Sequence, residues 1–322
     1  MKTQLILSLT LVAALALATA RAEEGASGHY LPGLTASCYD AMPSKPGIAA
    51  FNFFTMYDGN AGAGKPLNFS SEVALGVKAN FYAETIGTVY QSKLTLLGGN
   101  YGAVLAIPFV WVDVHAQAEV NGPKGKPLVT KNISDSASGL GDMTICPFIL
   151  GWQALGGDLK YDVRASIYAP TGSYDVGRLA NCGKNYWTFE PGASVSWLSS
   201  KIGTEVSLFT GVDFNTENDA TQYQTGAQFH LDLSVVQHLP LWGGFAGVGA
   251  NGFYYQQIQG DSGSGATLGD FEGQTVGVGP AISYARKIGQ CDAFAEVKWL
   301  PEIEVKNRTE GDYLWVKVGA LF

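Results

Sequence analysis

The chain has 322 residues and a formal net charge of −8, and only 15% of its residues are charged, whereas average domains carry about 25%. Its basic residues are not clustered, so nothing in the sequence would neutralise phosphates, which excludes nucleic acid as a partner. Beyond the N-terminus there is no run of about 18 apolar residues, the minimum for a membrane helix. The 41 glycines and 12% aromatic residues favour strands joined by tight turns.

The first residues have the pattern of an export signal. Lys2 is followed by an apolar run over 5–17 and then by small residues that suit a cleavage site. This pattern predicts a signal peptide over 1–22 that is cleaved after Ala22. The apolar run is too short to cross a membrane as a helix, so we expect an exported protein.

The next segment, 23–46, is too short to be a domain. It contains His29, Tyr30, Cys38 and Tyr39. We expect it to be either a plug or lid for the region that follows, or a loose periplasmic leader.

Strand-like alternation then continues to the C-terminus and predicts twelve strands. They cover 47–58, 78–92, 101–120, 140–153, 157–170, 187–198, 203–214, 222–238, 244–260, 271–287, 291–305 and 313–322. Long and short connections alternate between them, as the long outer loops and short periplasmic turns of outer-membrane barrels do. We therefore predict an all-β fold, a transmembrane antiparallel up-and-down barrel of about twelve strands over 47–322. A soluble β-sandwich is the alternative.

Three prolines, Pro108, Pro147 and Pro280, fall inside predicted strands. Proline donates no ladder hydrogen bond and is disfavoured in central strands. We expect bulges or local bends at these positions.

Within the strands, alternate residues form a polar face and an apolar face. In 157–170, Lys160, Asp162 and Arg164 share one face. An Arg or Lys facing lipid at the bilayer centre would cost about 2–4 kcal/mol, so the polar faces are predicted to point into the lumen. The predicted lumen-lining residues are Glu84, Asp113, His115, Asp142, Lys160, Asp162, Arg164, Glu190, Glu205, Asp213, His230, Asp232, Glu296 and Lys298.

The predicted lumen is dominated by acidic residues. Such a lumen would disfavour anionic solutes and tolerate neutral or cationic ones. Alternatively, the mixed charges fill the barrel with ion pairs. The sequence leaves both interpretations open.

The connection 171–186 is predicted to be an outer loop, tightly turned by its glycines and asparagines. Asp175 and Arg178 are expected to pair and hold it over the barrel mouth, with Asn181 beside them. After the loop, Trp187 and Phe189 would begin an aromatic girdle on the outside, while Glu190 faces inward.

The four cysteines, Cys38, Cys146, Cys182 and Cys291, have no CxxC or Cys/His spacing, so we expect no metal site and no cofactor. An oxidising compartment favours disulfides, and three pairings are possible. The predicted topology places Cys38 and Cys291 on the periplasmic side and the other two nearer the outside. This favours the pairs Cys38–Cys291 and Cys146–Cys182.

Catalysis is not expected. A lipid-acting barrel enzyme needs a serine nucleophile beside a histidine base on the outer, lipid-facing wall. His115 and His230 instead share their face with charged residues and are predicted to point inward. No GxSxG motif occurs either.

The last strand has one unbroken apolar face, formed by Leu314, Val316, Val318, Ala320 and Phe322. A closing strand of this kind, ending in an aromatic residue, is typical of bacterial outer-membrane barrels. We expect outer-membrane lipids around it, and recognition of Phe322 by the barrel assembly machinery.

Several short motifs are shared with one protein family. They are Gly28-His29-Tyr30-Leu31-Pro32-Gly33, Gly141-Asp142-Met143, the run 169–175, Asn185-Tyr186-Trp187-Thr188-Phe189-Glu190-Pro191, Phe229-His230-Leu231-Asp232 and the run 260–266. With these motifs the chain resembles, from about Gly28 to Phe322, the outer-membrane proteins named for the meta-pathway of phenol degradation. The resemblance implies a transporter that passes small hydrophobic or aromatic compounds across the outer membrane. A lipid-acting enzyme and a structural or adhesive barrel with a closed lumen are the alternatives.

Overall fold

The computed structural model describes residues 27–322 except 44, 63–65, 70–71, 122–126 and 267–271. The predicted signal peptide over 1–22 lies outside the described residues. Within them, no helix has the length and apolar character needed to cross a bilayer.

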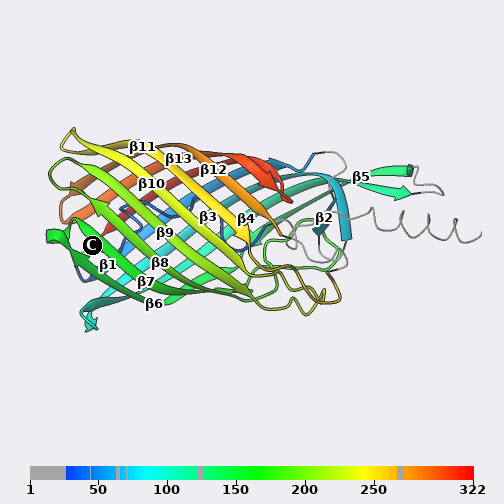
Figure 1. The fold of residues 1–322 in the computed structure, drawn as a ribbon, viewed down its shortest axis with the longest axis horizontal. Helices are drawn as coiled ribbons and strands as arrows, with labels where there is room; N and C mark the ends of the chain where they lie inside the picture. The colour runs from blue at the N-terminus through cyan, green and yellow to red at the C-terminus, as the bar shows by residue number, and fades with distance from the viewer. Residues whose placement is uncertain (1–26, 44, 63–65, 70–71, 122–126, 267–271) are drawn as a thin grey trace, which may run out of the picture.

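Twelve antiparallel strands form a closed ring (Figure 1). Each strand pairs with its neighbours around the ring, and β1 closes it by pairing with both β3 and β14. All twelve predicted segments overlap a strand of the ring, so the predicted fold class is confirmed. The ring strands are β1 (Gly47–Asn60), β3 (Glu72–Leu96), β4 (Gly99–Asn121), β6 (Met143–Ala154), β7 (Leu159–Ala169), β8 (Thr188–Leu198), β9 (Thr204–Asn215), β10 (Gln228–Leu241), β11 (Gly244–Gln257), β12 (Gln274–Ile288), β13 (Cys291–Lys306) and β14 (Glu310–Leu321).

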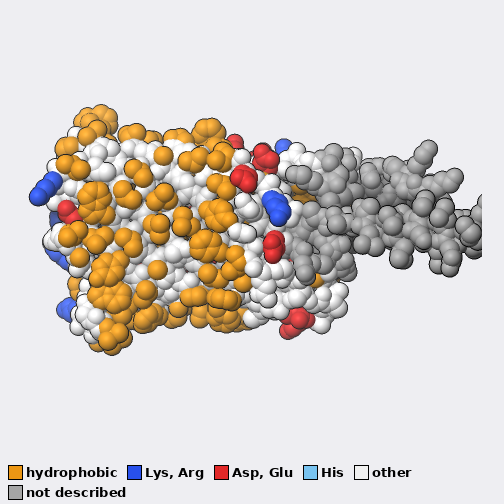
Figure 2. All heavy atoms as spheres, viewed as in Figure 1, with side chains coloured by type: hydrophobic (Ala, Val, Ile, Leu, Met, Phe, Trp, Pro, Cys, Tyr) orange, Lys and Arg blue, Asp and Glu red, His pale blue; other side chains and the backbone are white. Residues whose placement is uncertain are grey.

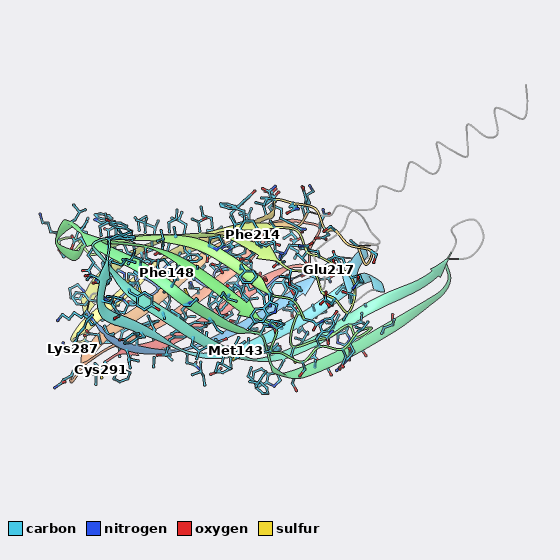
Figure 3. All side chains as sticks on the ribbon, turned by 90° about the horizontal axis from the view of Figure 1, so that it is seen from below. Met143, Phe148, Phe214, Glu217, Lys287 and Cys291 are labelled. Carbon is cyan, nitrogen blue, oxygen red and sulfur yellow. The ribbon has the colours of Figure 1, made fainter. Side chains whose placement is uncertain are left out.

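Two further strands fall in segments that the sequence predicted to be loops. The short β2 (Pro66–Phe69) pairs with the start of β3, and β5 (Pro127–Leu140) pairs with the second half of β4. The β4–β5 hairpin projects beyond the ring (Figures 1 and 3). A strand forms here because the backbone N–H and C=O groups of the extended part of β4 need partners.

Short connections gather at one end of the ring, the turn end, where the C-terminus also lies (Figure 1). They include 97–98, 242–243, 289–290 and the 3₁₀ turn η2 (Leu155–Gly157). Figure 3 labels Lys287 and Cys291 at this end and Glu217 at the opposite one, the loop end. The predicted alternation of long and short connections is therefore present in the structure.

On the face shown in Figure 2 an apolar band covers the outside of the ring, and charged side chains gather at its two edges. The last strand shows the underlying alternation, because Val318 is 44% exposed whereas Trp315 is 1% exposed. Trp187 and Phe189 are also exposed, as the predicted aromatic girdle requires. This is the surface expected of a barrel surrounded by lipid.

The prolines lie at irregularities in the ladder, as predicted. Pro108 lies where β4 exchanges β6 for β5 as its partner, and its carbonyl accepts a hydrogen bond from Gly141 N at 3.0 Å. Pro147 lies in a register shift between β6 and β7. Pro280 lies in a stretch where the pairing of β12 with β13 is interrupted, between Gly277 and Ala281.

Candidate functional site

Residues 27–43, called the plug from here on, lie inside the ring without forming a strand. At the loop end His29 contacts Asp142. Toward the turn end Met42 packs beside Ile149 of β6. The plug therefore extends along the lumen rather than beneath the barrel.

Local sequence explains how the plug bends inside so narrow a space. Gly33 has φ +79°, and a Cβ at this position would lie 2.2 Å from Leu300 Cδ1. Glycine adopts this conformation without steric cost, and a residue with a Cβ could not admit Leu300 so closely. Next to it, Trp315 Nε1 donates a hydrogen bond to the carbonyl of Pro32 at 3.1 Å.

Asp232 of β10 is the main anchor of the plug. Its carboxylate accepts hydrogen bonds from the Tyr30 hydroxyl, from Gly33 N at 3.2 Å, and from both N and Oγ1 of Thr35 at 3.1 and 2.6 Å. Four donors on one buried carboxylate satisfy it without any solvent. Hydrogen bonds to a charged group are worth about 1.5–3 kcal/mol each, so this anchor fixes the middle of the plug.

Two further contacts hold the part of the plug toward the turn end. Cys38 N donates to Glu205 Oε1 at 2.6 Å, and the Lys317 ammonium lies 2.8 Å from Asp40 Oδ1. Burial alone would raise the pKa of Asp40, but the ammonium groups of Lys317 and Lys298 outweigh it and hold that pKa below its ordinary value. Asp40 is therefore a carboxylate at neutral pH.

A second carboxylate holds the loop end of the plug. Asp142 accepts hydrogen bonds from Gly172 N at 2.8 Å and Lys184 N at 2.7 Å, and its Oδ2 lies 2.9 Å from His29 Nε2. Burial raises the pKa of Asp142, but the contact with His29 and the two backbone donors outweigh it and lower the pKa overall. Asp142 thus joins the plug to the outer loop 170–187.

The inward faces of β7 to β14, called the polar wall, carry most of the predicted lumen-lining residues. Their charges are largely paired or bound to the plug. Arg164 donates to both oxygens of Asp162 at 2.8 and 2.7 Å, and Glu296 lies 3.7 Å from Lys317. The inward-facing residues of this wall include Lys160, Asp162, Arg164, Glu190, Glu205, Asp213, His230, Asp232, Glu296 and Lys298.

The inward faces of β1, β3 and β4, called the apolar wall, lie beside a cavity of about 380 Å³ that also borders the plug. Aromatic, aliphatic and threonine side chains of these strands line it. From β1, β3 and β4 they are Ala49, Ala50, Phe51, Phe53, Thr55, Tyr57, Ala79, Phe81, Ala83, Thr85, Val89, Val104, Ala106, Pro108, Val110, Val112 and Val114. The plug contributes apolar side chains such as Leu31, Leu34 and Met42 and polar ones such as His29, Thr35 and Asp40. On the side of the polar wall the cavity reaches Arg164, Glu190 and Lys317.

The family described as "Putative MetA-pathway of phenol degradation" matches residues 62–318. The chain belongs to this family. Its fold is similar to that of the COG4313 outer membrane channel from Pseudomonas putida F1, with a TM-score of 0.65, 13% identity, and 88% of this chain and 97% of that chain covered. The family predicted from the sequence motifs is therefore confirmed.

More distant likenesses are to autotransporter barrels. The β domain of Bordetella BrkA has a TM-score of 0.45 at 11% identity, covering 86% of this chain and 100% of that one. The AIDA-I transport unit from Escherichia coli has a TM-score of 0.43 at 10% identity, covering 92% and 94%. No curated protein matches the chain by sequence. The chain thus has the fold of an outer-membrane barrel, as its apolar outer band and the likeness to the outer membrane channel indicate.

Three residues predicted to line the lumen face outward instead. Asp113 and His115 are exposed, and they share parity with the exposed, outward-facing Trp111. An outward charge is not unfavourable here, because Asp113 and His115 lie on the part of β4 that pairs with β5 in the projecting hairpin and therefore do not face lipid. Glu84 has the parity of the exposed Ile86 and accepts a hydrogen bond from Asn52 Nδ2 at 2.5 Å.

The outer position of His115 also removes one argument used against catalysis. In the β4–β5 register His115 lies across from Ser134. Residues paired in this way share a face of the sheet, so a histidine and a serine stand together on the outside of the projecting hairpin.

The predicted pair of Asp175 and Arg178 does not form. Arg178 instead donates to Asp135 of β5, at 2.7 and 3.1 Å. Asp175 exchanges two hydrogen bonds with Asn181, from its own N to Asn181 Oδ1 at 2.8 Å and from Asn181 Nδ2 to its carbonyl at 3.2 Å. The loop is thus held to the neighbouring hairpin as well as to itself.

Neither predicted disulfide is present, and all four cysteines are free thiols. Cys146 packs with Met42 and Ile149 inside the barrel. Cys182 lies in the outer loop, where its N donates to Ser173 O at 3.2 Å. Cys146 and Cys182 were predicted to pair, but they lie at different depths in the barrel and are therefore too far apart to do so.

Lys317 and Asp40 are lumen charges that were not predicted from the sequence. Lys317 could have been predicted to face the lumen, because it has the same parity as Tyr313 and Trp315, opposite the apolar face of the last strand. Asp40 gave no such signal, since the plug has no repeating pattern.

Proposed function

We propose that the barrel is a passive channel for small hydrophobic solutes, which cross the outer membrane along the apolar wall. The observation that carries this proposal is the cavity between the plug and β1, β3 and β4. A volume of about 380 Å³ lies near the lower end of the range of ligand sites, about 300–1,000 Å³. It would hold one small solute at a time.

The chemistry of the two walls favours an apolar solute. A hydrated solute that entered the cavity would lose hydrogen bonds to water, which the apolar wall cannot replace. An apolar solute gains about 25 cal/mol for each Å² removed from water. Arg164, Glu190 and Lys317 also line the cavity, but they already bind Asp162, Tyr168 and Asp40 and so offer a polar solute less than free charges would.

Two likenesses support the proposal. The similar solved structure is described as an outer membrane channel, and the family description refers to phenol degradation. Aromatic compounds are therefore the first substrate class to test. Since outer-membrane barrels direct short turns to the periplasm, such a solute would enter at the loop end and leave at the turn end.

The test is the initial uptake rate of a labelled naphthalene-sized aromatic by Gram-negative cells that produce the protein. Ala106 is buried and lines the cavity, so Ala106→Trp should fill it and lower the protein-dependent rate about tenfold, since tight packing leaves an indole no other room. The matched control is Ala103→Trp on the same strand, opposite the outward-facing Tyr90. It should leave uptake unchanged.

Heat-modifiable gel mobility would establish that both variants are folded barrels. Equal uptake by folded wild type and Ala106→Trp would contradict a route along the apolar wall. Uptake by neither wild type nor variant, above cells without the protein, would contradict the channel itself.

A further inference from the structure

Three ionisable side chains meet in the polar wall beneath the plug. Glu190, Asp213 and His230 come from the adjacent strands β8, β9 and β10, and their exposed fractions are 2%, 0% and 0%. His230 Nε2 lies 3.6 Å from Asp213 Oδ1 and 3.9 Å from Glu190 Oε1. None of these contacts belongs to the anchors of the plug.

Most polar atoms of this cluster have no hydrogen-bond partner. Both carboxylate oxygens of Asp213 and both ring nitrogens of His230 are buried and unpartnered within the described part of the chain. Asp232, two residues from His230, has four donors. Buried polar groups are almost always satisfied, and an exception of this kind requires an explanation such as a bound ion.

The charge of the cluster indicates what is missing. With a neutral imidazole, the two carboxylates carry two negative charges in a water-excluded wall, which is costly unless they are compensated. The guanidinium of Arg164 makes its hydrogen bonds to Asp162. The Tyr168 hydroxyl donates to Glu190 Oε2 at 2.5 Å and leaves Oε1 on the side of His230.

The spacing and the donor types fit a transition metal. Zinc binds imidazole nitrogen and carboxylate oxygen at about 2.0–2.2 Å, so tetrahedral ligand atoms lie about 3.3–3.6 Å apart. The distances of 3.6 and 3.9 Å are slightly wider than this, and one ligand atom from each residue lies within 4.8 Å of the others. Calcium and magnesium prefer oxygen ligands alone, whereas imidazole suits zinc and its neighbours.

The backbone leaves room at the centre of the cluster. A Cβ on Gly211 would lie 2.7 Å from His230 Nε2 and 3.1 Å from Glu190 Oε1. The ladder between β8 and β9 is also interrupted here, between the pairs Phe189–Phe214 and Gly192–Gly211. Above it the ring of Tyr30 stacks on His230, with 3.8 Å between centroids.

From this geometry we propose that Glu190, Asp213 and His230 bind one divalent transition-metal ion, with Zn²⁺ the best fit. The ion would neutralise the two carboxylates and tie three neighbouring strands together. Because Tyr30 covers His230, the plug would close the site. The sequence could not show such a site, since the three ligands lie in different strands with no short-range spacing.

The test uses the folded, chelator-treated protein in detergent micelles. Calorimetric titration with Zn²⁺ should give one equivalent bound, and Co²⁺ should give the visible absorption of a four-coordinate site. Asp213→Asn and His230→Gln should each weaken Zn²⁺ binding at least about a hundredfold, since even the loss of an outer-shell partner costs 10- to 100-fold. Glu302→Gln is the control, because this buried carboxylate accepts hydrogen bonds from Thr275 Oγ1 at 2.7 Å and Gly311 N at 2.7 Å and lies outside the cluster.

Should the ligand variants lose heat-modifiable mobility, Gly211→Ala provides the second route. Its methyl group would occupy the space beside His230 and should lower the affinity for Zn²⁺ in a folded barrel. The proposal is overturned if folded wild type binds no stoichiometric Zn²⁺, or if folded ligand variants bind it as tightly as wild type. It is also overturned if binding is lost only in Cys38→Ser/His238→Gln, which alters the separate group of Cys38, Glu205 and His238.

Discussion

The polar wall and the apolar wall make different kinds of contact with the same plug. The polar wall holds it by directed hydrogen bonds, with Asp232, Glu205 and Lys317 each bound to a different part of the plug. The apolar wall packs on Met42 of the plug toward the turn end, and elsewhere it faces the plug across a cavity lined by side chains such as Val110. One wall therefore fixes the position of the plug, and the other leaves the space beside it.

This difference assigns the positioning of the plug to one wall and the space for a solute to the other. Hydrogen bonds to buried carboxylates are directional and strong, so they hold a segment in one place. Apolar contacts are non-directional and depend on the area removed from water. On the proposed route along the apolar wall, a solute would therefore not have to break the contacts that position the plug.

The largest expected effect comes from removing the main anchor. Asp232→Ala deletes the acceptor of four hydrogen bonds from the plug. Losing about 3 kcal/mol of docking energy would raise the population of barrels with an undocked plug about a hundredfold. Planar-bilayer recordings should show larger and more frequent openings than those of wild type.

Glu302→Gln is the matched control for this variant. Glu302 is also a buried carboxylate, but it accepts from Tyr57, Thr275 and Gly311 rather than from the plug. It should keep the conductance of wild type. If Asp232→Ala and Glu302→Gln behaved alike, the polar wall would not be what positions the plug.

Acidification should weaken the two ends of the plug in a predictable direction. Both Asp142 and Asp40 have pKa values below the ordinary value, lowered in one case by His29 and backbone donors and in the other by Lys317, against the opposing effect of burial. A lowered pKa means that the stabilising contribution is complete above the ordinary aspartate pKa of about 3.9 and is lost as the pH falls through the lower folded value. Conductance should thus be constant from pH 8 to 5 and rise below about 3.9.

The double variant Asp40→Asn/Asp142→Asn provides the comparison. Without these two titrating groups, the rise in conductance at low pH should be absent. A rise between pH 7 and 5 in wild type would contradict this assignment, because both carboxylates remain charged there.

The sequence predicted the ring because its signal is local. The alternation of residues and the lengths of connections are properties of neighbouring residues, and they located all twelve ring strands. The face of 101–120 was assigned wrongly because both faces of this strand are apolar over most of its length, with Leu105, Ile107 and Trp111 on one face and Val110 on the other. Asp113 decided the assignment, yet it lies where an outward charge does not meet lipid.

The contacts across the lumen could not be predicted in the same way. Alternation shows that Glu190, Asp213 and His230 share the inner surface, but only the register between strands brings one ligand atom of each within 4.8 Å of the others. The plug has no period at all, so its bonds to Asp232 left no pattern in the sequence. The disulfide prediction failed for a related reason, since it needed the depth of each cysteine and not only its side of the membrane.

The smallest effect is expected from the ion pair that joins the outer loop to the projecting hairpin. Arg178 belongs to the loop that follows β7 of the polar wall, and Asp135 belongs to the hairpin that extends β4 of the apolar wall. Their side chains are 39% and 23% exposed, and exposed ion pairs contribute about 0–1 kcal/mol. Arg178→Ala should therefore lower the free energy of unfolding by less than about 1 kcal/mol in urea titrations, and by still less in high salt. Arg178 lines the cavity, but removing its side chain does not block the space between the plug and the apolar wall, so aromatic uptake should stay close to that of wild type. A large increase in uptake would mean that the outer loop closes the route.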